Sequence, residues 1–138
     1  MRNDRGVLPR AALEIRPAHR YEYVAVEAFY SETQFEKSRP LENTEILSIN
    51  SQPVGISRHF IDKNGHCVIQ DIQVSSTWQG KGVGTRVVMS LLDKARRDGR
   101  GVRLQLFKKN RARELYVRLG FKQVDETEAH YCIEAFPR

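Results

Sequence analysis

Short apolar runs with strand-like composition alternate along the chain with longer stretches of helical period. Residues 1–11 are expected to form a loose lead-in. The Asn64-Gly65 pair is a strong hairpin signal, so we expect the three central strands to form an antiparallel meander. The predicted strands are Ala12–Arg16, Glu45–Ile49, Val54–Ile61, Cys67–Val74, 102–107, Phe121–Val124 and His130–Phe136.

Three stretches have the period of a helix. Residues 20–36 place aromatic and aliphatic side chains, Phe29 and Tyr30 among them, on a broad apolar stripe. In residues 82–98, valines, leucines and alanine recur at helical spacing until Asp98-Gly99 ends the pattern. The third helix is predicted after Asn110, a favourable N-cap, and ends at Gly120. The resulting order, β-α-β-β-β-α-β-α-β-β, predicts an α/β fold around a mixed sheet.

Composition is typical of a single globular domain, which we expect to span residues 1–138. Of its 138 residues, 40% are hydrophobic and 29% are charged. No apolar run approaches the roughly 18 residues needed to cross a bilayer, and the polar N-terminus lacks the apolar segment of a signal peptide. Cys67 and Cys132 are expected to be free thiols. These features favour a cytoplasmic protein without membrane contact.

The net charge of +6 indicates an anionic partner. Nucleic acid, a phosphate-rich cofactor and an acidic substrate all fit this charge. A charge of this size also serves solubility alone, so it does not choose between them.

The informative stretch is Gln79-Gly80-Lys81-Gly82-Val83-Gly84, which lies between a predicted strand and the helix at 82–98. Glycine lets the backbone approach a ligand closely and adopt positive φ. The first amides of the following helix point into such a loop, and the helix dipole favours an anion there. The loop is therefore a candidate diphosphate site.

Two common phosphate-binding motifs do not fit this loop. A Walker A motif requires a Ser or Thr after its Gly-Lys, and Lys81 is followed by Gly82. In a dinucleotide-binding fingerprint the third glycine comes one residue later and an acidic residue ends the next strand, whereas this strand ends in Leu106-Phe107-Lys108-Lys109. The loop instead resembles Gln/Arg-x-x-Gly-x-Gly/Ala, the pyrophosphate-binding signature of GNAT acetyltransferases, at every defined position.

The resemblance to the GNAT superfamily extends over residues 68–136. Residues 110–121 are similar to the family segment Asn-x-x-Ala-x-x-Leu-Tyr-x-x-x-Gly-Phe, with one residue fewer between Asn110 and Ala112, and residues 12–61 agree only in the order of elements. The resemblance implies a mixed, mostly antiparallel sheet that is splayed between its fourth and fifth strands and flanked by helices. The helical region after the first strand is shorter than in many members, which leaves the acceptor side undefined.

The resemblance also implies acetyl-coenzyme A (acetyl-CoA) as the acyl-donor cosubstrate. Backbone groups of Ile72, Gln73 and Val74 would bind the pantetheine arm. Amides of Gln79, Gly80, Lys81, Gly82, Val83 and Gly84, with Thr85, would bind the pyrophosphate, surrounded by neighbouring lysines and arginines. Asn110 would contact the cofactor, cap its helix, or do both.

Tyr116 matches the family tyrosine that protonates the departing thiolate. A hydroxyl of pKa about 10 stays protonated at neutral pH and can act as this acid. The resemblance implies an amide at the strand end, that of Val74, as the donor to the thioester oxygen. Some members carry a glutamate base where this chain has Val68; Asp71, Glu45 and His130 are left as alternatives, alone or through water.

The leading hypothesis is an N-acetyltransferase that acts on a primary amine of a small molecule, amino acid or peptide. A catalytically silent acyl-CoA-binding regulatory module is the alternative. A small basic nucleic-acid-binding domain is less favoured, because the aromatic residues do not gather beside the basic ones. The histidines and cysteines are not spaced as metal ligands, so no metal is expected. The sequence leaves a homodimer open.

Overall fold

A computed structural model describes residues 13–18, 43–110 and 112–136. The predicted helix at 20–36, with Phe29 and Tyr30, lies outside the described residues, as do the lead-in and Arg111. Structural statements below concern the described part of the chain.

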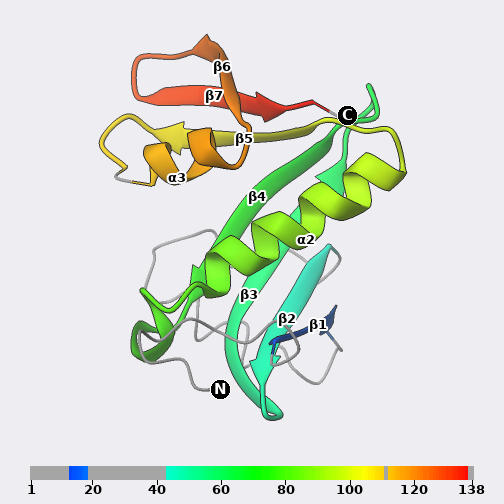
Figure 1. The fold of residues 1–138 in the computed structure, drawn as a ribbon, viewed down its shortest axis with the longest axis vertical. Helices are drawn as coiled ribbons and strands as arrows, with labels where there is room; N and C mark the ends of the chain where they lie inside the picture. The colour runs from blue at the N-terminus through cyan, green and yellow to red at the C-terminus, as the bar shows by residue number, and fades with distance from the viewer. Residues whose placement is uncertain (1–12, 19–42, 111, 137–138) are drawn as a thin grey trace. The chain divides into compact units, whose positions relative to one another are not determined.

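Seven strands form one sheet in the order β1-β2-β3-β4-β5-β7-β6 (Figure 1). Neighbouring strands are antiparallel in the pairs β1–β2, β2–β3, β5–β7 and β6–β7. Strands β4 and β5 are parallel, and their ladder joins Cys67–Ile69 to Val102–Leu104, the first three residues of each strand. The mixed, mostly antiparallel sheet is therefore confirmed. The strands are β1 (Leu13–Pro17), β2 (Thr44–Ile49), β3 (Gln52–Ile61), β4 (Cys67–Val74), β5 (Val102–Phe107), β6 (Lys122–Glu126) and β7 (His130–Ala135).

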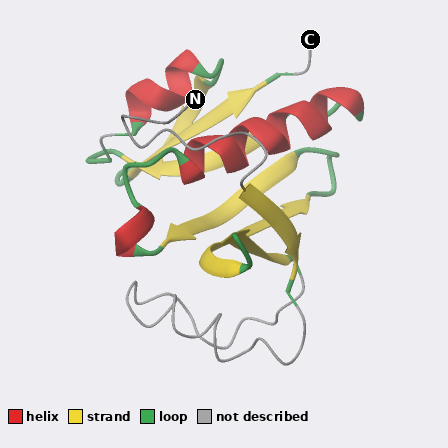
Figure 2. Cartoon of the chain, turned by 60° about the horizontal axis from the view of Figure 1, so that its bottom comes forward, coloured by secondary structure: helices red, strands yellow, loops and turns green. Residues whose placement is uncertain are grey.

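The long helix α2 (Val83–Arg97) follows a short 3₁₀ helix, η3 (Ser76–Trp78), as Figure 2 shows. The apolar positions that predicted α2 are buried except for Leu92, which is half-buried, and this confirms the helical period. The helix ends where predicted: Gly99 adopts a φ of +69°, and the N–H of Arg100 donates to the carbonyl of Ala95 at 2.8 Å. The buried residues of α2 are Val83, Val87, Val88, Leu91 and Ala95.

The predicted N-cap of the last helix is wrong. Helix α3 (Arg113–Arg118) has Ala112 as its N-cap residue. The side-chain oxygen of Asn110 instead accepts a hydrogen bond from the N–H of Ala112 at 2.8 Å. An asparagine commonly bonds its own backbone two residues on, and this bond closes a turn ahead of the helix.

The described chain divides into two compact units. The first comprises the described residues up to Arg58 together with Asp71–Val87, and the second comprises His59–Gln70 and the described residues from Val88 onward. Apolar side chains are buried in both units, and the single domain stays a prediction. Buried residues of the first include Ile46, Leu47, Val54 and Ile56, and those of the second include Ile69, Leu104, Phe121 and Ile133.

Two polar arrangements order the second unit around the turn between β3 and β4. One oxygen of Asp62 accepts the N–H groups of Asn64 and His66, both at 2.9 Å. The carboxylate of Glu134, which is 2% exposed as a residue, pairs with Arg103 and lies 3.7 Å from Nε2 of His66. A β-carbon on Gly101 would lie 3.0 Å from a Glu134 oxygen, so this glycine leaves room for the carboxylate.

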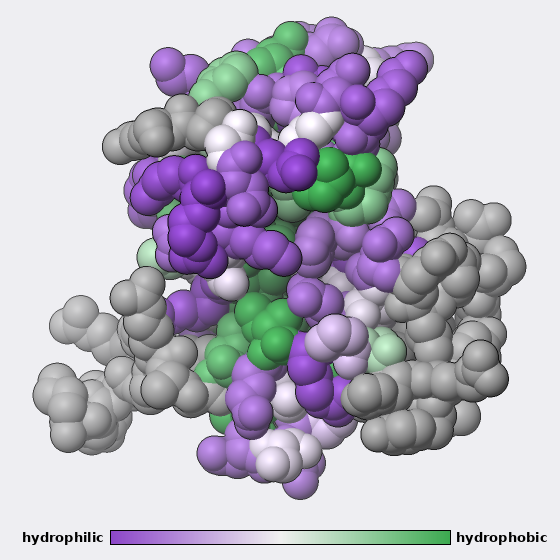
Figure 3. Space-filling view, turned by 90° about the vertical axis from the view of Figure 1, so that its right-hand side faces the viewer, coloured by the Kyte–Doolittle hydropathy of each residue, from purple (hydrophilic) through white to green (hydrophobic). Residues whose placement is uncertain are grey.

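The surface of the described residues is mostly hydrophilic on the face shown in Figure 3, with apolar residues in small separate groups. The large exposed apolar side chains include Phe107 and Phe136, which are 61% and 57% exposed. Within the described ranges, no helix combines the length and apolar character required to cross a membrane.

Candidate active site

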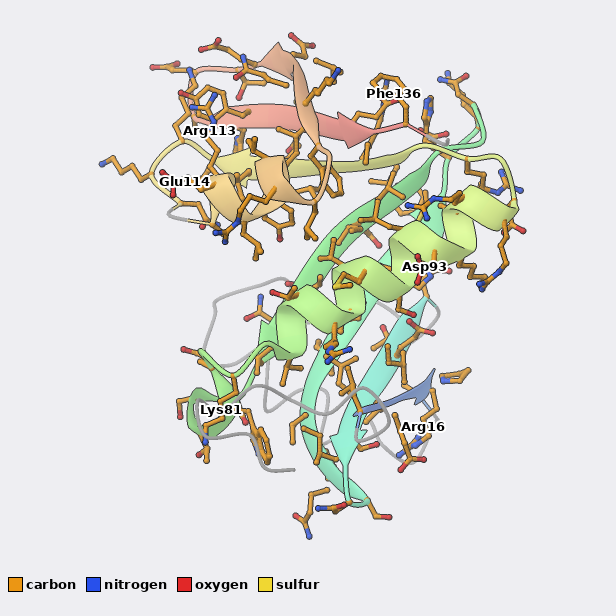
Figure 4. The ribbon with its side chains drawn as sticks, viewed as in Figure 1. Arg16, Lys81, Asp93, Arg113, Glu114 and Phe136 are labelled. Carbon is orange, nitrogen blue, oxygen red and sulfur yellow. The ribbon has the colours of Figure 1, made fainter. Side chains whose placement is uncertain are left out.

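The glycine loop lies in the first unit, between η3 and α2, and Figure 4 labels its Lys81. Gly80 and Gly82 adopt φ angles of +76° and +88°. L-residues rarely adopt this conformation, so both positions need glycine for the backbone itself. This explains two of the three glycines of the motif.

The third glycine, Gly84, has no such backbone requirement. It lies in the first turn of α2 without positive φ, and a β-carbon added there would have no described atom within 4 Å. Alanine would fit this position in the free protein and would favour the helix. Neither the backbone conformation nor a described neighbour therefore requires glycine at position 84.

The start of α2 supplies backbone donors beside these glycines. The N–H of Arg86 donates to the carbonyl of Gly82 at 3.0 Å, which closes the first turn. The backbone N–H groups before Arg86 precede the first hydrogen bond of the helix, so the helix itself provides no acceptor for them. The first turn carries no acidic side chain, so nothing there opposes an anion.

Lys81 has an aromatic partner that the sequence analysis missed. Its Nζ lies 5.4 Å from the ring centroid of Trp78 in η3, within the range of a cation–π contact. The contact keeps the ammonium group beside the loop. The Trp78-to-Lys81 spacing alone did not reveal it, because the 3₁₀ turn that brings them together had not been predicted.

The end of β4 is tied to the loop by the first residue of the motif. The side-chain amide of Gln79 donates to the carbonyl of Val74 at 2.9 Å. On the same peptide group, the N–H of Ser75 donates to the carbonyl of Val54 in β3 at 2.8 Å. The strand end is therefore held from the loop and from β3.

Gly55 in β3 is a second residue that the sequence analysis missed. It is buried, and a β-carbon there would lie 2.2 Å from the carbonyl oxygen of Gln73 and 3.2 Å from Cα of Val74. Distances under 3.0 Å do not occur for real β-carbons, so only glycine fits here without movement. An isolated glycine in a strand is a signal of close backbone approach.

The candidate bases have different surroundings. Asp71 in β4 is partly buried and accepts a hydrogen bond from the side chain of Gln73 at 2.6 Å. Glu45 in β2 is partly buried and pairs in register with Ser57. In the second unit, the ring of His130 lies 4.3 Å from that of Phe107. Geometry does not single out one of them.

Tyr116 lies on α3 in the second unit and is partly buried. Its ring meets Phe121 edge to face, with 5.5 Å between centroids. Burial raises the pKa of the Tyr116 hydroxyl above its ordinary value of 10.0, because the charged phenolate loses solvation. The hydroxyl therefore stays protonated throughout the neutral range.

Basic side chains near α3 have partners of their own. Arg113, at the start of the helix in Figure 4, lies 4.2 Å from the ring of Tyr131, and Nζ of Lys108 lies 5.4 Å from the same ring. Lys108 also pairs with Glu126 at 2.5 Å, and this hydrogen bond holds the pKa of Glu126 below its usual value. These two cations are thus held against Tyr131.

The predicted site residues fall into two groups. Ile72, Gln73 and Val74 lie in the first unit with the loop residues 79–84 and Thr85, whereas Asn110 and Tyr116 lie in the second. Within the first group, the Gln79 side chain connects the loop directly to the strand end. Among the described residues, no cluster of three or more His, Cys, Asp or Glu side chains is arranged to hold a metal ion.

Comparison with solved structures shows the same fold in several acetyltransferases. Ard1 from Thermoplasma volcanium has a TM-score of 0.74 at 16% identity, over 92% of this chain and 99% of that one. PaiA N-acetyltransferase from Thermoplasma acidophilum, in complex with coenzyme A, scores 0.72 at 14% identity over 91% and 99%. Arabidopsis thaliana Naa50, bound to the bisubstrate analogue CoA-Ac-MVNAL, scores 0.71 at 15% identity over 89% and 97%.

A search of curated proteins found no match. The family model described as acetyltransferase (GNAT) family matches residues 11–121, which is most of the chain and includes the glycine loop. Together with the mixed sheet and its parallel β4–β5 pair, this match settles the family: the chain belongs to the GNAT acetyltransferases.

Proposed function

We propose that the protein transfers the acetyl group of acetyl-CoA to a primary amine of a small molecule, amino acid or peptide. The observation that carries this proposal is the loop at residues 79–84. Gly80 and Gly82 need glycine for their backbone, and a β-carbon on Gly84, at the start of α2, would have no described atom within 4 Å. Members of the family use acetyl-CoA in this way, and the loop is the part of the chain that would bind its diphosphate.

In this proposal, backbone amides from Gln79 to Gly84, with Thr85, bind the pyrophosphate of acetyl-CoA. The absence of acidic side chains in the first turn of α2 and the nearby Lys81 favour the anion. Ile72, Gln73 and Val74 at the end of β4 bind the pantetheine arm through their backbone. Asn110 contributes a cofactor contact beyond the turn that it closes with Ala112.

The amine nitrogen attacks the thioester carbonyl carbon, and the new C–N bond forms as charge gathers on the carbonyl oxygen. The N–H of Val74 donates to that oxygen and stabilises it. The tetrahedral intermediate then collapses, and the C–S bond breaks. The proton that the amine must lose goes to water or to a weak base, since Val68 stands where some members carry a glutamate.

Tyr116 supplies the proton that the departing thiolate needs. The sulfur leaves more readily when it receives a proton as the C–S bond breaks. A thiol has a pKa of about 8.5, so it keeps that proton at neutral pH. The hydroxyl of Tyr116 is neutral at neutral pH and has a proton to donate. Because burial raises its pKa, it is a weaker acid than the thiol, so the transfer depends on the phenolate being reprotonated afterwards. The resulting phenolate regains a proton from solvent, and free coenzyme A and the acetylated amine leave.

A turnover assay on the full chain tests this function. The release of free thiol from acetyl-CoA is measured with a panel of small amines, amino acids and short peptides, against a reaction without amine. Amine-dependent release supports the proposal. Calorimetric binding of acetyl-CoA without release for any amine would indicate the silent regulatory module instead. Binding of nucleic acid without binding of acetyl-CoA would overturn the assignment.

A further inference from the structure

Two consecutive peptide groups at the end of β4 are fixed by residues outside that strand. The carbonyl oxygen of Gln73 is the nearest atom to a β-carbon placed on Gly55, at 2.2 Å. Its carbonyl carbon is not among the three nearest atoms, which reach to 3.2 Å, so the C=O bond points at Gly55. The orientation of the peptide between Gln73 and Val74 is thereby defined.

This orientation also determines where the next N–H points. The described residues contain no cis peptide bond, and in a trans peptide the C=O and the N–H point in opposite directions. Because the Gln73 carbonyl points at Gly55, the N–H of Val74 points away from Gly55. Any side chain at position 55 would have to displace the carbonyl and rotate this N–H with it.

The following peptide group, between Val74 and Ser75, is held at both of its polar atoms. Its carbonyl accepts the side-chain amide of Gln79, and its N–H donates to Val54. Gln79 is exposed, so its hydrogen bond to Val74 contributes little to the stability of the fold. The effect of this bond is to hold the strand end in one orientation.

We propose that Gly55 and the side chain of Gln79 are positioning residues that aim the N–H of Val74 at the thioester oxygen of acetyl-CoA. This inference rests on the proposed function. Gly55 acts by leaving space for the Gln73 carbonyl, and Gln79 acts by holding the Val74 carbonyl. Neither Gly55 nor Gln79 is proposed to touch the reacting atoms.

The first test replaces Gly55 by alanine. The Gln73–Val74 peptide must then turn, and we expect kcat at saturating acetyl-CoA to fall by about 10²-fold, the scale of a misplaced catalytic group. Free coenzyme A has no thioester oxygen, so its calorimetric affinity should fall far less than kcat. Gly101→Ala is the matched control: it places a β-carbon 3.0 Å from Glu134 in the other unit and should lower stability while retaining kcat.

The second test uses the exposed Gln79, where substitution does not threaten folding. Gln79→Met keeps the length of the side chain and removes the donor, and we expect kcat to fall about tenfold, the effect of one lost hydrogen bond. Gln79→Arg restores an N–H donor and should recover most of this loss. Gln52→Met, at an exposed position at the start of β3, is the control and should have the wild-type kcat.

The outcomes separate this inference from the proposed function. A wild-type chain that releases no thiol with any amine overturns both. An active wild type with unchanged kcat in folded Gly55→Ala and in Gln79→Met overturns the positioning roles alone. A loss of kcat in Gln79→Met that arginine does not rescue also counts against the hydrogen bond to Val74.

Discussion

At the scale of single residues, four glycines illustrate three different reasons why a position carries no side chain. Gly80 and Gly82 adopt positive φ, and Gly55 lies against a neighbouring carbonyl. Gly84 has neither constraint. The first two reasons belong to the fold of the free protein, and the third, the approach of a diphosphate to Gly84, belongs to the proposed function.

Substitution of Gly84 should therefore change stability and affinity in opposite directions. Gly84→Ala should raise the free energy of unfolding by about 0.5 kcal/mol, because glycine weakens a helix. The same methyl group should lower the affinity for coenzyme A, because it stands where the proposed function places the diphosphate. Chemical denaturation and calorimetry measure the two effects. Gly80→Ala should lose stability instead, because position 80 has a φ of +76°. Unchanged affinity for coenzyme A in Gly84→Ala would contradict the assignment of the loop.

The loop could be predicted from sequence because its glycines recur within six residues before a helical period. Gly55 could not, because an isolated glycine in a strand predicts a close approach without naming the partner, and the partner is in another strand. The side-chain role of Gln79 was hidden for a related reason. Its distance in sequence from Val74 does not reveal that η3 turns the chain back toward the strand end.

Replacement of Tyr116 tests the proposed acid. Tyr116→Phe removes the hydroxyl and keeps the ring that packs on Phe121, so the fold should be retained. We expect kcat to fall by roughly 10²–10⁴-fold if proton donation limits the rate, with little change in affinity for coenzyme A. Tyr131→Phe, which keeps the ring that contacts Lys108 and Arg113, is the matched control. A wild-type kcat in Tyr116→Phe would make Tyr116 a packing residue.

The pH dependence of the reaction follows from the same hydroxyl and from the amine. A lysine-like amine has a pKa near 10, so the rate should rise with pH as the free amine increases. The active form of Tyr116 is the neutral one, and burial raises its pKa above 10.0, so the alkaline decline should begin above that pH. Initial rates with a slow amine between pH 6 and pH 11 check this. A constant rate from about pH 6 to pH 9 would require an efficient base near neutrality.

At the scale of elements, burial decides what a sequence pattern can predict. The buried face of α2 repeats at helical spacing, and the predicted bounds lie within one residue of the observed ones. Strand β6 is exposed at every position and α3 has no buried residue, so neither element has a strong pattern. The start of α3 was misplaced because Asn110 bonds to Ala112 and not to a helical amide.

The turn between β3 and β4 should respond to acid. The N–H of His66 and, with it, that of Asn64 hold the pKa of Asp62 below its ordinary value of 3.8. A lowered pKa contributes stability that is complete above the ordinary value and is lost as pH falls through the lowered one. Asp62→Ala should lower the melting temperature at pH 7 and should flatten the stability profile below pH 4. An equally steep acid profile in this variant would assign the loss to other carboxylates.

At the scale of the whole molecule, three of the described elements contribute residues to both units. Strands β3 and β4 and helix α2 each cross from one unit to the other. A unit that unfolded alone would have to break these elements in the middle. The single domain predicted from the length of the chain therefore has a thermodynamic test.

Unfolding should occur in one cooperative transition. The chain has one tryptophan, Trp78, in the first unit, so its fluorescence follows that unit, whereas far-ultraviolet circular dichroism follows the whole chain. Both signals should give the same denaturant midpoint. Two separate midpoints would show two domains and would contradict the prediction.

The buried carboxylate of Glu134 links positions that are far apart in the sequence. Its oxygen lies 3.0 Å from the place of a β-carbon on Gly101, and its charge is matched by Arg103, two residues after that glycine. A substitution at position 101, 103 or 134 is made in a structure that is fitted to the residues at the other two positions. Its effect on stability therefore depends on which residues those two positions carry. Over evolution, these positions should change together or not at all. Among related chains, a residue larger than glycine at 101 should accompany the loss of the glutamate at 134.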